Sequence, residues 1–386
     1  MELKAPDFRK REDKLSGWLD GEVRTFLFDS FSDDYCTRTG MEFLRGVDIP
    51  IKPGDLAAFR GEGGLPVTDL ADNMALVIGA NTQFKYRDAY ISYLALYFNE
   101  KLVDVLVQKG AEELRAQHYR KSCIYFRAAL LLDSQHREAL FGYACCCREW
   151  YLSMEGEDQQ ELIGILKKES TEYFEHVTRV WPDYAAAYYF LGYAYVNAGQ
   201  YKKAELAWKK FLKLSDASTG SASVGGTESA KVPEPSTVPE SSAVPGPSTG
   251  PESVEGTDPS TTPAQVPDEI AEIRERIASL ADPVKIEEGI QALVAGHLED
   301  GLRILERYVG TQYDNWWPLH YYLASAYREL GFFDEAIEGF KRVLALQPSH
   351  EESCECLADL YAADGDAENS EKYRRKAEII RRNRME

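Results

Sequence analysis

Residues 188–208 read YYFLGYAYVNAGQYKKAELAW, and residues 320–340, far along the chain, repeat the pattern as HYYLASAYRELGFFDEAIEGF. In both stretches apolar residues recur every three or four positions on either side of a glycine, which is the spacing of two amphipathic helices joined by a turn. The matching positions hold Leu191 and Leu323, Gly192 and Ala324, Tyr195 and Tyr327, Gly199 and Gly331, Tyr201 and Phe333, Ala204 and Ala336, and Trp208 and Phe340. The chain therefore contains at least two copies of one helix-pair unit.

The order of these residues resembles the 34-residue unit of the tetratricopeptide repeat (TPR) family. Small residues such as Gly192 and Ala204 let the two helices of a unit approach closely, while Tyr195 and Trp208 fill the gap to the next unit. One unit alone leaves an apolar face uncovered, so several units must stack. The resemblance implies an all-α fold, a right-handed superhelical solenoid of antiparallel helix pairs.

A step of 34 residues from the two clear copies locates four weaker ones. The predicted repeats cover residues 103–136, 137–184, 185–215, 282–315, 317–350 and 351–384. Counting from Arg137 to Pro182 gives 46 residues, where the repeat expects about 32, so we expect an insertion near 151–165, in the turn between the helices. The first three repeats form one block over 103–215. The last three form a second block over 268–386, together with a capping helix that carries Ile270, Ile273, Ile277 and Leu280.

Residues 216–267 differ in composition from the rest of the chain, because they contain no aromatic residue, Leu, Ile or Met, and nine of the 17 prolines. Such a segment cannot form a core, so we predict a disordered linker that interrupts the solenoid. Whether it lets the two blocks separate and close around a partner is left open. Residues 1–66 match no repeat and are predicted as an irregular N-terminal segment. Residues 67–102, with helical patterns at 68–78 and 88–98, are predicted as a helical N-terminal cap.

Charge and hydropathy exclude several classes of partner. The chain has 44 Lys and Arg against 64 Asp and Glu, a formal net charge of −20, which disfavours nucleic acids and anionic membranes. No segment approaches the ~18 apolar residues of a membrane helix, and no signal-peptide core is present. The seven cysteines, an odd number, fit no disulfide framework. We therefore predict a cytoplasmic protein with no nucleic-acid partner and no membrane insertion.

The sequence also lacks the common enzyme motifs. It contains no Gly-x-x-x-x-Gly-Lys-Ser/Thr, no His-Glu-x-x-His and no Gly-x-Ser-x-Gly. The run Cys145-Cys146-Cys147 cannot surround one metal ion, because successive side chains on a helix point about 100° apart. We expect these cysteines to be small buried residues. The prediction is a protein with no catalytic residue, no metal site and no cofactor, hence no enzyme.

The resemblance itself suggests a binding surface. In TPR proteins the first helix of each unit lines a concave groove, which implies a scaffold or adaptor that binds a peptide or a partner helix. Tyr and Arg dominate binding hot spots, and the expected groove residues are Arg115, Phe141, Arg148, Tyr189, Tyr193, Asn197, Tyr321 and Arg328. An equally weighted interpretation assigns Tyr189 and Tyr193 to packing between repeats. As an alternative function, a regulatory or catalytic N-terminal region is positioned by the repeats.

Overall fold

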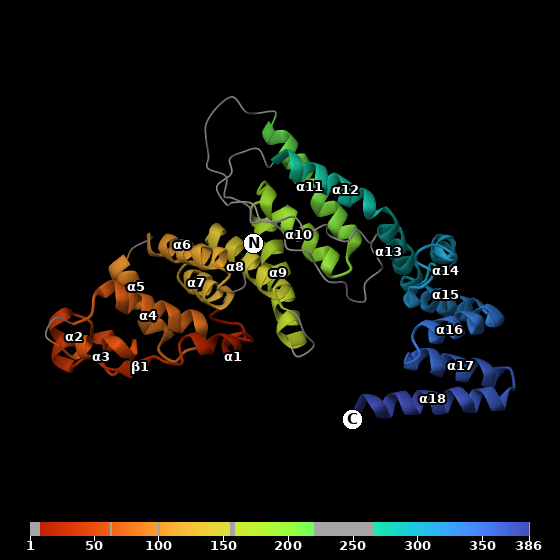
Figure 1. The fold of residues 1–386 in the computed structure, drawn as a ribbon, viewed down its shortest axis with the longest axis horizontal. Coiled ribbons are helices and arrows are strands. Elements are labelled where there is room, and N and C mark those ends of the chain that lie inside the picture. The colour runs from red at the N-terminus through yellow and green to blue at the C-terminus, as the bar shows by residue number, and fades with distance from the viewer. Residues whose placement is uncertain (1–7, 62–63, 99–100, 155–158, 220–265, 386) are drawn as a thin grey trace. The chain divides into compact units, whose positions relative to one another are not determined.

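The structure is a computed structural model that describes residues 8–61, 64–98, 101–154, 159–219 and 266–385. Over these residues the chain is built from helices in adjacent pairs, with one two-stranded sheet near the N-terminus (Figure 1). Two compact units are distinguished: an N-terminal unit of residues 1–194 and 213–238, and a C-terminal unit of residues 195–212 and 239–386. The boundary thus falls inside the third predicted repeat. Most of the predicted linker, residues 220–265, lies outside the described residues.

The region predicted as irregular, residues 1–66, contains several short elements. They are α1 (Ser16–Leu19), β1 (Leu27–Asp29), α2 (Asp33–Thr39), β2 (Ile49–Ile51) and α3 (Leu56–Arg60), with single 3₁₀ turns at 20–22, 42–44 and 53–55. The strands β1 and β2 are antiparallel, with Leu27 opposite Ile51 and Asp29 opposite Ile49. All of β2 is buried, and the carbonyl of Pro50 accepts a hydrogen bond of 3.1 Å from the buried Asn73 amide. This small sheet is thereby fixed to the first long helix, α4.

The remaining helices follow the predicted pairing closely. In the N-terminal half they are α4 (Val67–Ala80), α5 (Arg87–Phe98), α6 (Lys101–Arg115), α7 (Tyr119–Leu132), α8 (Arg137–Leu152), α9 (Gln160–Val180), α10 (Ala185–Asn197) and α11 (Tyr201–Thr219). In the C-terminal half they are α12 (Val266–Ser279), α13 (Ala281–Val294), α14 (Leu298–Leu305, continued by a 3₁₀ turn at 306–308), α15 (Trp317–Leu330), α16 (Phe333–Leu346), α17 (Glu351–Ala363) and α18 (Ala367–Met385). Two helices lie in each of the six expected repeat ranges, and α4 and α5 lie in the range expected to form the N-terminal cap.

The insertion in the second repeat is accommodated differently from the expectation. Only residues 153–159 separate α8 from α9, and α9 is 21 residues long. Leu162 and Leu166, in its first turns, are buried. Part of the insertion therefore extends α9, where its apolar side chains are buried, instead of lengthening the turn.

Glycines mark the two places where a helix pair needs them. At the turn, Gly199, Gly296, Gly331 and Gly365 have φ between +67° and +84°, a conformation that residues with a Cβ rarely adopt. At the crossing, a Cβ on Gly339 would lie 2.7 Å from the Cβ of Ala324, so α15 and α16 touch there through their smallest side chains. The predicted role of small residues in close helix approach is thus confirmed.

The tightest crossing gives a stability prediction. A Cβ added at Gly79 in α4 would lie 2.2 Å from the carbonyl oxygen of Ile124 in α7, so Gly79→Ala must push two helices apart. We expect it to lower the free energy of unfolding by about 1 to 3 kcal/mol. The matched control is Gly164→Ala in α9, where the new Cβ meets nothing within 4 Å, and it should stabilise the helix by about 0.5 to 1 kcal/mol. Urea denaturation followed by circular dichroism measures both, and equal effects would contradict the crossing geometry.

Candidate protein-binding surface

In the C-terminal unit, the first helices α15 and α17 present partly exposed aromatic and charged side chains. The hydroxyl of Tyr321 donates a 3.0 Å hydrogen bond to the Glu352 carboxylate. The His350 ring lies 5.0 Å from the ring of Tyr321 and 4.5 Å from that of Trp317. His350 also caps α17, since its Nδ1 accepts from the backbone N–H of Ser353 at 3.2 Å. Tyr321 is thus held in place on a surface that solvent still reaches.

Titration properties follow from these contacts. Partial burial, reinforced by the nearby Glu352 carboxylate, raises the pKa of Tyr321 to about 12. Burial lowers the pKa of His350 below its ordinary value. At neutral pH Tyr321 is therefore a protonated hydrogen-bond donor and His350 is uncharged. Further along α15, the guanidinium of Arg328 lies 3.0 Å from the Cys356 sulfur of α17 and is half-buried.

In the N-terminal unit, four of the expected groove residues come together in one cluster. The guanidinium carbon of Arg148 lies 5.6 Å from the ring centre of Tyr193, which in turn lies 5.2 Å from that of Tyr189. Phe141 joins them through Phe190, with 5.8 Å between ring centres. All of these side chains are buried, Arg148 completely. They contribute to packing between α8 and α10, as the second interpretation of Tyr189 and Tyr193 anticipates.

The other expected groove residues lie apart from that cluster. Arg115 is exposed at the end of α6, and Asn197 is half-buried at the end of α10. Tyr321 and Arg328 lie two helical turns apart on α15 and share one side of it. The expected set therefore divides into a buried group on α8 and α10 and a partly exposed group distributed over the first helices of several pairs.

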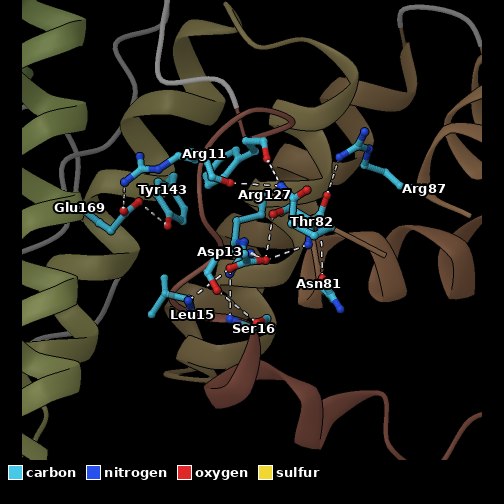
Figure 2. Close-up of polar contacts among 12 residues, drawn as sticks. Arg11, Asp13, Leu15, Ser16, Asn81, Thr82, Arg87, Arg127, Tyr143 and Glu169 are labelled. Atoms are coloured by element: carbon cyan, nitrogen blue, oxygen red, sulfur yellow. Dashed lines mark hydrogen bonds and ion pairs between the residues drawn. The ribbon is translucent and has the colours of Figure 1, made fainter. Parts of the chain in front are cut away.

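A second surface was not anticipated from the sequence. Residues 8–15, which we call the strap, lie across α7, α8 and α9 and the turn after α4 (Figure 2). The carboxylate of Asp13 accepts a 2.5 Å hydrogen bond from Arg127, and it accepts two more, of 2.8 Å each, from the backbone and hydroxyl of Thr82. Only 6 % of the Asp13 side chain and 1 % of the Arg127 side chain are exposed. This ion pair is therefore buried, although its partners are 114 residues apart in the sequence.

Two further side chains anchor the strap. Arg11 forms an ion pair with Glu169 of α9, and the Glu169 carboxylate also accepts a 2.9 Å hydrogen bond from Tyr143 (Figure 2). The Phe8 ring lies 5.5 Å from that of Tyr143 and 5.8 Å from that of Tyr173. The strap thus places an aromatic ring, a cation and an anion on the surface below.

The two buried carboxylates respond differently to their surroundings. Burial by itself would raise the pKa of Asp13, but Arg127 and the Thr82 hydrogen bonds outweigh it and lower that pKa. At Glu169 burial prevails over Arg11 and Tyr143, and the pKa is raised. Asp13 is therefore firmly ionised when it is bound to Arg127.

The sequence carried a signal for this surface. Arg127 stands inside the largely apolar run of residues 122–132. Charged residues are rarely buried without a partner, so this position indicates an ion pair with another part of the chain. The pattern does not reveal that the partner is Asp13, because a pairing over more than a hundred residues has no local spacing.

In the described part of the chain, neither the cysteines nor the other metal-binding residue types form a metal site. Cys145, Cys146 and Cys147 are each at most 2 % exposed, which confirms the expectation that they are small buried residues. Among residues 8–61, 64–98, 101–154, 159–219 and 266–385, no three His, Cys, Asp or Glu side chains are grouped as a metal ion would require. The same residues contain no helix with the length and apolarity needed to span a membrane.

Comparisons with known proteins address the family. Models of the tetratricopeptide repeat match residues 317–350 and residues 169–217. No curated protein matches the chain significantly in sequence. The first match falls on α15 and α16, and the second on α9 to α11. The first therefore coincides with one helix pair and has the same limits as the predicted fifth repeat, whereas the second covers the end of α9 and the pair α10 and α11.

The solved structures that match the chain are distant in sequence. The P58(IPK) TPR domain is 16 % identical, with 71 % of this chain and 59 % of that one covered and a TM-score of 0.33. This chain thus spans somewhat less than two thirds of that structure. A tetratricopeptide repeat protein from Parabacteroides merdae is 12 % identical, with coverages of 81 % and 93 % and a TM-score of 0.29. The TPR2AB domain of yeast Sti1, in complex with pHSP90, is 13 % identical, with coverages of 72 % and 91 % and a TM-score of 0.26.

The two family matches and the helix pairs agree on the nature of the repeat. Each matched segment contains a short first helix, a glycine turn and a second helix that ends in large apolar residues. The small residues at the crossings and the buried aromatic residues between pairs have the packing roles that the repeat requires. The chain is a tetratricopeptide-repeat protein.

Proposed function

We propose that this chain is a scaffold that holds a protein partner along the first helices of its repeats, with α15 and α17 as the main contact. Repeats of this kind stack into extended surfaces that bind proteins and peptides, which supports the general role. The specific surface is argued from the side chains of α15 and α17.

The partly exposed row on α15 carries this proposal. Trp317, Tyr321 and Arg328 are spaced by four and seven residues, so they follow one side of the helix, and all three are half-buried. Glu352 and Cys356 of α17 lie beside this row, through their contacts with Tyr321 and Arg328. Trp, Tyr and Arg are the residue types with the largest effects in protein interfaces. A partly covered row of them offers both apolar area and hydrogen bonds to an incoming segment.

The other expected groove residues have two roles in this proposal. Arg115 and Asn197, which are less covered, are available for partner contacts on their own helices, α6 and α10. The buried side chains on α8 and α10 act indirectly, because they fix the helices whose outer residues would meet the partner. These are Phe141, Arg148, Tyr189 and Tyr193.

The test compares two double variants of the full chain as bait in quantitative pull-downs. Tyr321→Ala/Arg328→Ala removes two residues of the row, and we expect it to reduce recovery of specific partners about tenfold or more. The control, Phe333→Ala/Lys341→Ala, removes an aromatic and a cationic side chain from the second helix α16 and should leave recovery unchanged. Circular dichroism verifies that both remain folded. Equal partner recovery by both variants would refute the assignment of this face.

A further inference from the structure

The strap is held in the way that a bound peptide is held. It contains no helix or strand, and the cap and repeat helices provide partners for its backbone as well as for its side chains. The amide of Gln83 donates to the carbonyls of Phe8 and Arg11, at 2.9 and 3.1 Å. These two bonds go to the backbone of the strap, so they do not depend on the sequence of the occupant. The Arg9 side chain adds a 2.6 Å hydrogen bond to the carbonyl of Leu131.

The surface beneath the strap has an ordered set of recognition groups. Tyr143 and Tyr173 receive the aromatic ring of Phe8, Glu169 receives the cation three residues later, and Arg127 receives the carboxylate five residues after the ring. The groups come from α7, α8 and α9, so the folded repeats position them. A charged group on each side, of opposite sign, sets the direction in which an occupant can lie.

The strap leaves part of this surface unused. Arg127 is almost fully buried, yet its Nε and Nη1 have no hydrogen-bond partner among the described residues. Buried donors without acceptors weaken binding, and a planar guanidinium can hold a carboxylate through two parallel hydrogen bonds. Asp13 binds Nη2 of Arg127 alone, so an occupant whose carboxylate bound Nη2 together with Nε or with Nη1 would form two parallel hydrogen bonds and fit better than Asp13 does.

We propose that the surface formed by Arg127, Tyr143, Glu169 and Tyr173 is a peptide-recognition site, and that the strap occupies it until a partner segment replaces it. The segment it fits carries an aromatic residue, Arg three positions later and Asp or Glu five positions later. The proposal concerns a different surface from the row on α15, so each can hold without the other. It takes up the regulatory role predicted for the N-terminal region, because access to the site depends on release of the strap.

Competition from the strap sets the expected binding behaviour. A segment tethered to its own site acts at an effective concentration on the order of millimolar. A free peptide with the same sequence must overcome that concentration, so it should bind the wild type weakly. A chain whose strap has lost its anchors should bind the same peptide much more strongly, because the site is intact and vacated.

The experiment measures binding of a labelled synthetic peptide, with the sequence of residues 6–17, to the full-length chain by fluorescence anisotropy. Phe8→Ala/Asp13→Ala in the chain releases the strap, and we expect its Kd for the peptide to be about tenfold or more below that of the wild type. The control variant Glu12→Ala/Lys14→Ala changes two exposed residues of the strap and should bind like the wild type. A peptide that carries the Phe8→Ala and Asp13→Asn changes should lose the binding.

Hydrogen exchange distinguishes an occupant from a structural element. In the wild type we expect the amides of residues 8–15 to exchange about tenfold or more faster than those of α7 and α9, because the strap opens without unfolding of the repeats. The proposal is overturned if the strap exchanges only together with α7 and α9, or if the released variant loses protection in those helices. It is also overturned if a folded released variant shows no peptide binding.

Discussion

Phe340→Ala is expected to lower the free energy of unfolding of the C-terminal unit by about 3 to 5 kcal/mol. The Phe340 ring is completely buried in a cluster that joins two consecutive repeats. Its neighbours are Ala324, Ala336, Leu344, Cys354, Leu357, Leu360 and Ala377. The substitution removes the largest side chain of this cluster and leaves a cavity that helices fixed by several neighbours cannot close.

The loss should affect both repeats that share the cluster. In a repeat protein, stability is approximately the sum of the stability of each unit and of the contacts with its neighbours. Hydrogen exchange should therefore show weakened protection in α15 and α16 and also in α17 and α18. A decrease confined to α16 would contradict the shared core.

A control on the same helix separates burial from residue type. Phe333→Ala is the same chemical change at a position that is 55 % exposed. Little apolar area leaves water there on folding, so we expect less than about 1 kcal/mol. Urea denaturation of both variants measures the difference, and comparable losses would show that Phe340 does not have the assigned packing role.

Arg127→Leu is expected to destabilise the N-terminal unit by about 3 kcal/mol, the lower end of the range for breaking a buried ion pair. The substitution keeps the apolar volume but leaves the Asp13 carboxylate without its cation. A strap that detaches can return Asp13 to water, and this limits the loss. For comparison, Arg24→Ala removes an ion pair with Asp20 whose side chains are more than half exposed, and exposed pairs contribute little.

The sign of the pH dependence follows from Asp13. Its pKa is lowered in the folded wild type, so its contribution to stability is present above the ordinary pKa and is lost as the pH falls through the lowered value. In Arg127→Leu the Thr82 hydrogen bonds remain, but the cation that also lowers the Asp13 pKa is gone, so the pKa of a docked Asp13 is higher than in the wild type. Protonation of Asp13 therefore costs the variant less stability than it costs the wild type. The difference in unfolding free energy should therefore shrink from pH 7 to pH 4.

A double-mutant cycle tests the coupling directly. Asp13→Asn/Arg127→Leu removes both charges, so it should lose less than the sum of the two single variants if the pair interacts. Thermal and urea denaturation at pH 7 provide the four values. Additive losses would mean that Arg127 stabilises the unit through packing alone, without Asp13.

The repeats could be recognised from the sequence because their determinants are local. The spacing from Leu191 to Trp208 specifies two helices and a turn within 18 residues, and Gly199 marks the turn by a conformation that other residues rarely adopt. Because every repeat packs against its neighbours in the same way, the same residue spacing recurs, and the second copy at 320–340 supports the assignment of the first. The same reasoning predicted the limits 317–350 of the fifth repeat.

The expected groove residues show that helical spacing does not predict how deeply a side chain is buried. Helical spacing puts Tyr189, Tyr193 and Tyr321 on first helices, but it does not determine how deeply each is covered. Tyr189 and Tyr193 are buried beside Arg148, whereas Tyr321 remains partly exposed. How deeply a side chain is buried depends on the neighbouring repeats that pack against it. Those repeats are separate segments of the sequence, and the spacing within one repeat does not specify their contacts.

By itself, the sequence determined the pairing of the helices and the small residues at their crossings, because each depends on contacts within about 34 residues. Only the tertiary structure revealed that residues 8–15 bind across α7, α8 and α9. Asp13 and Arg127 are 114 residues apart, and neither position has a pattern that points to the other. Their attraction becomes strong only after the repeats have folded and removed water from both charges, since the interaction of two charges increases as the surrounding dielectric constant falls.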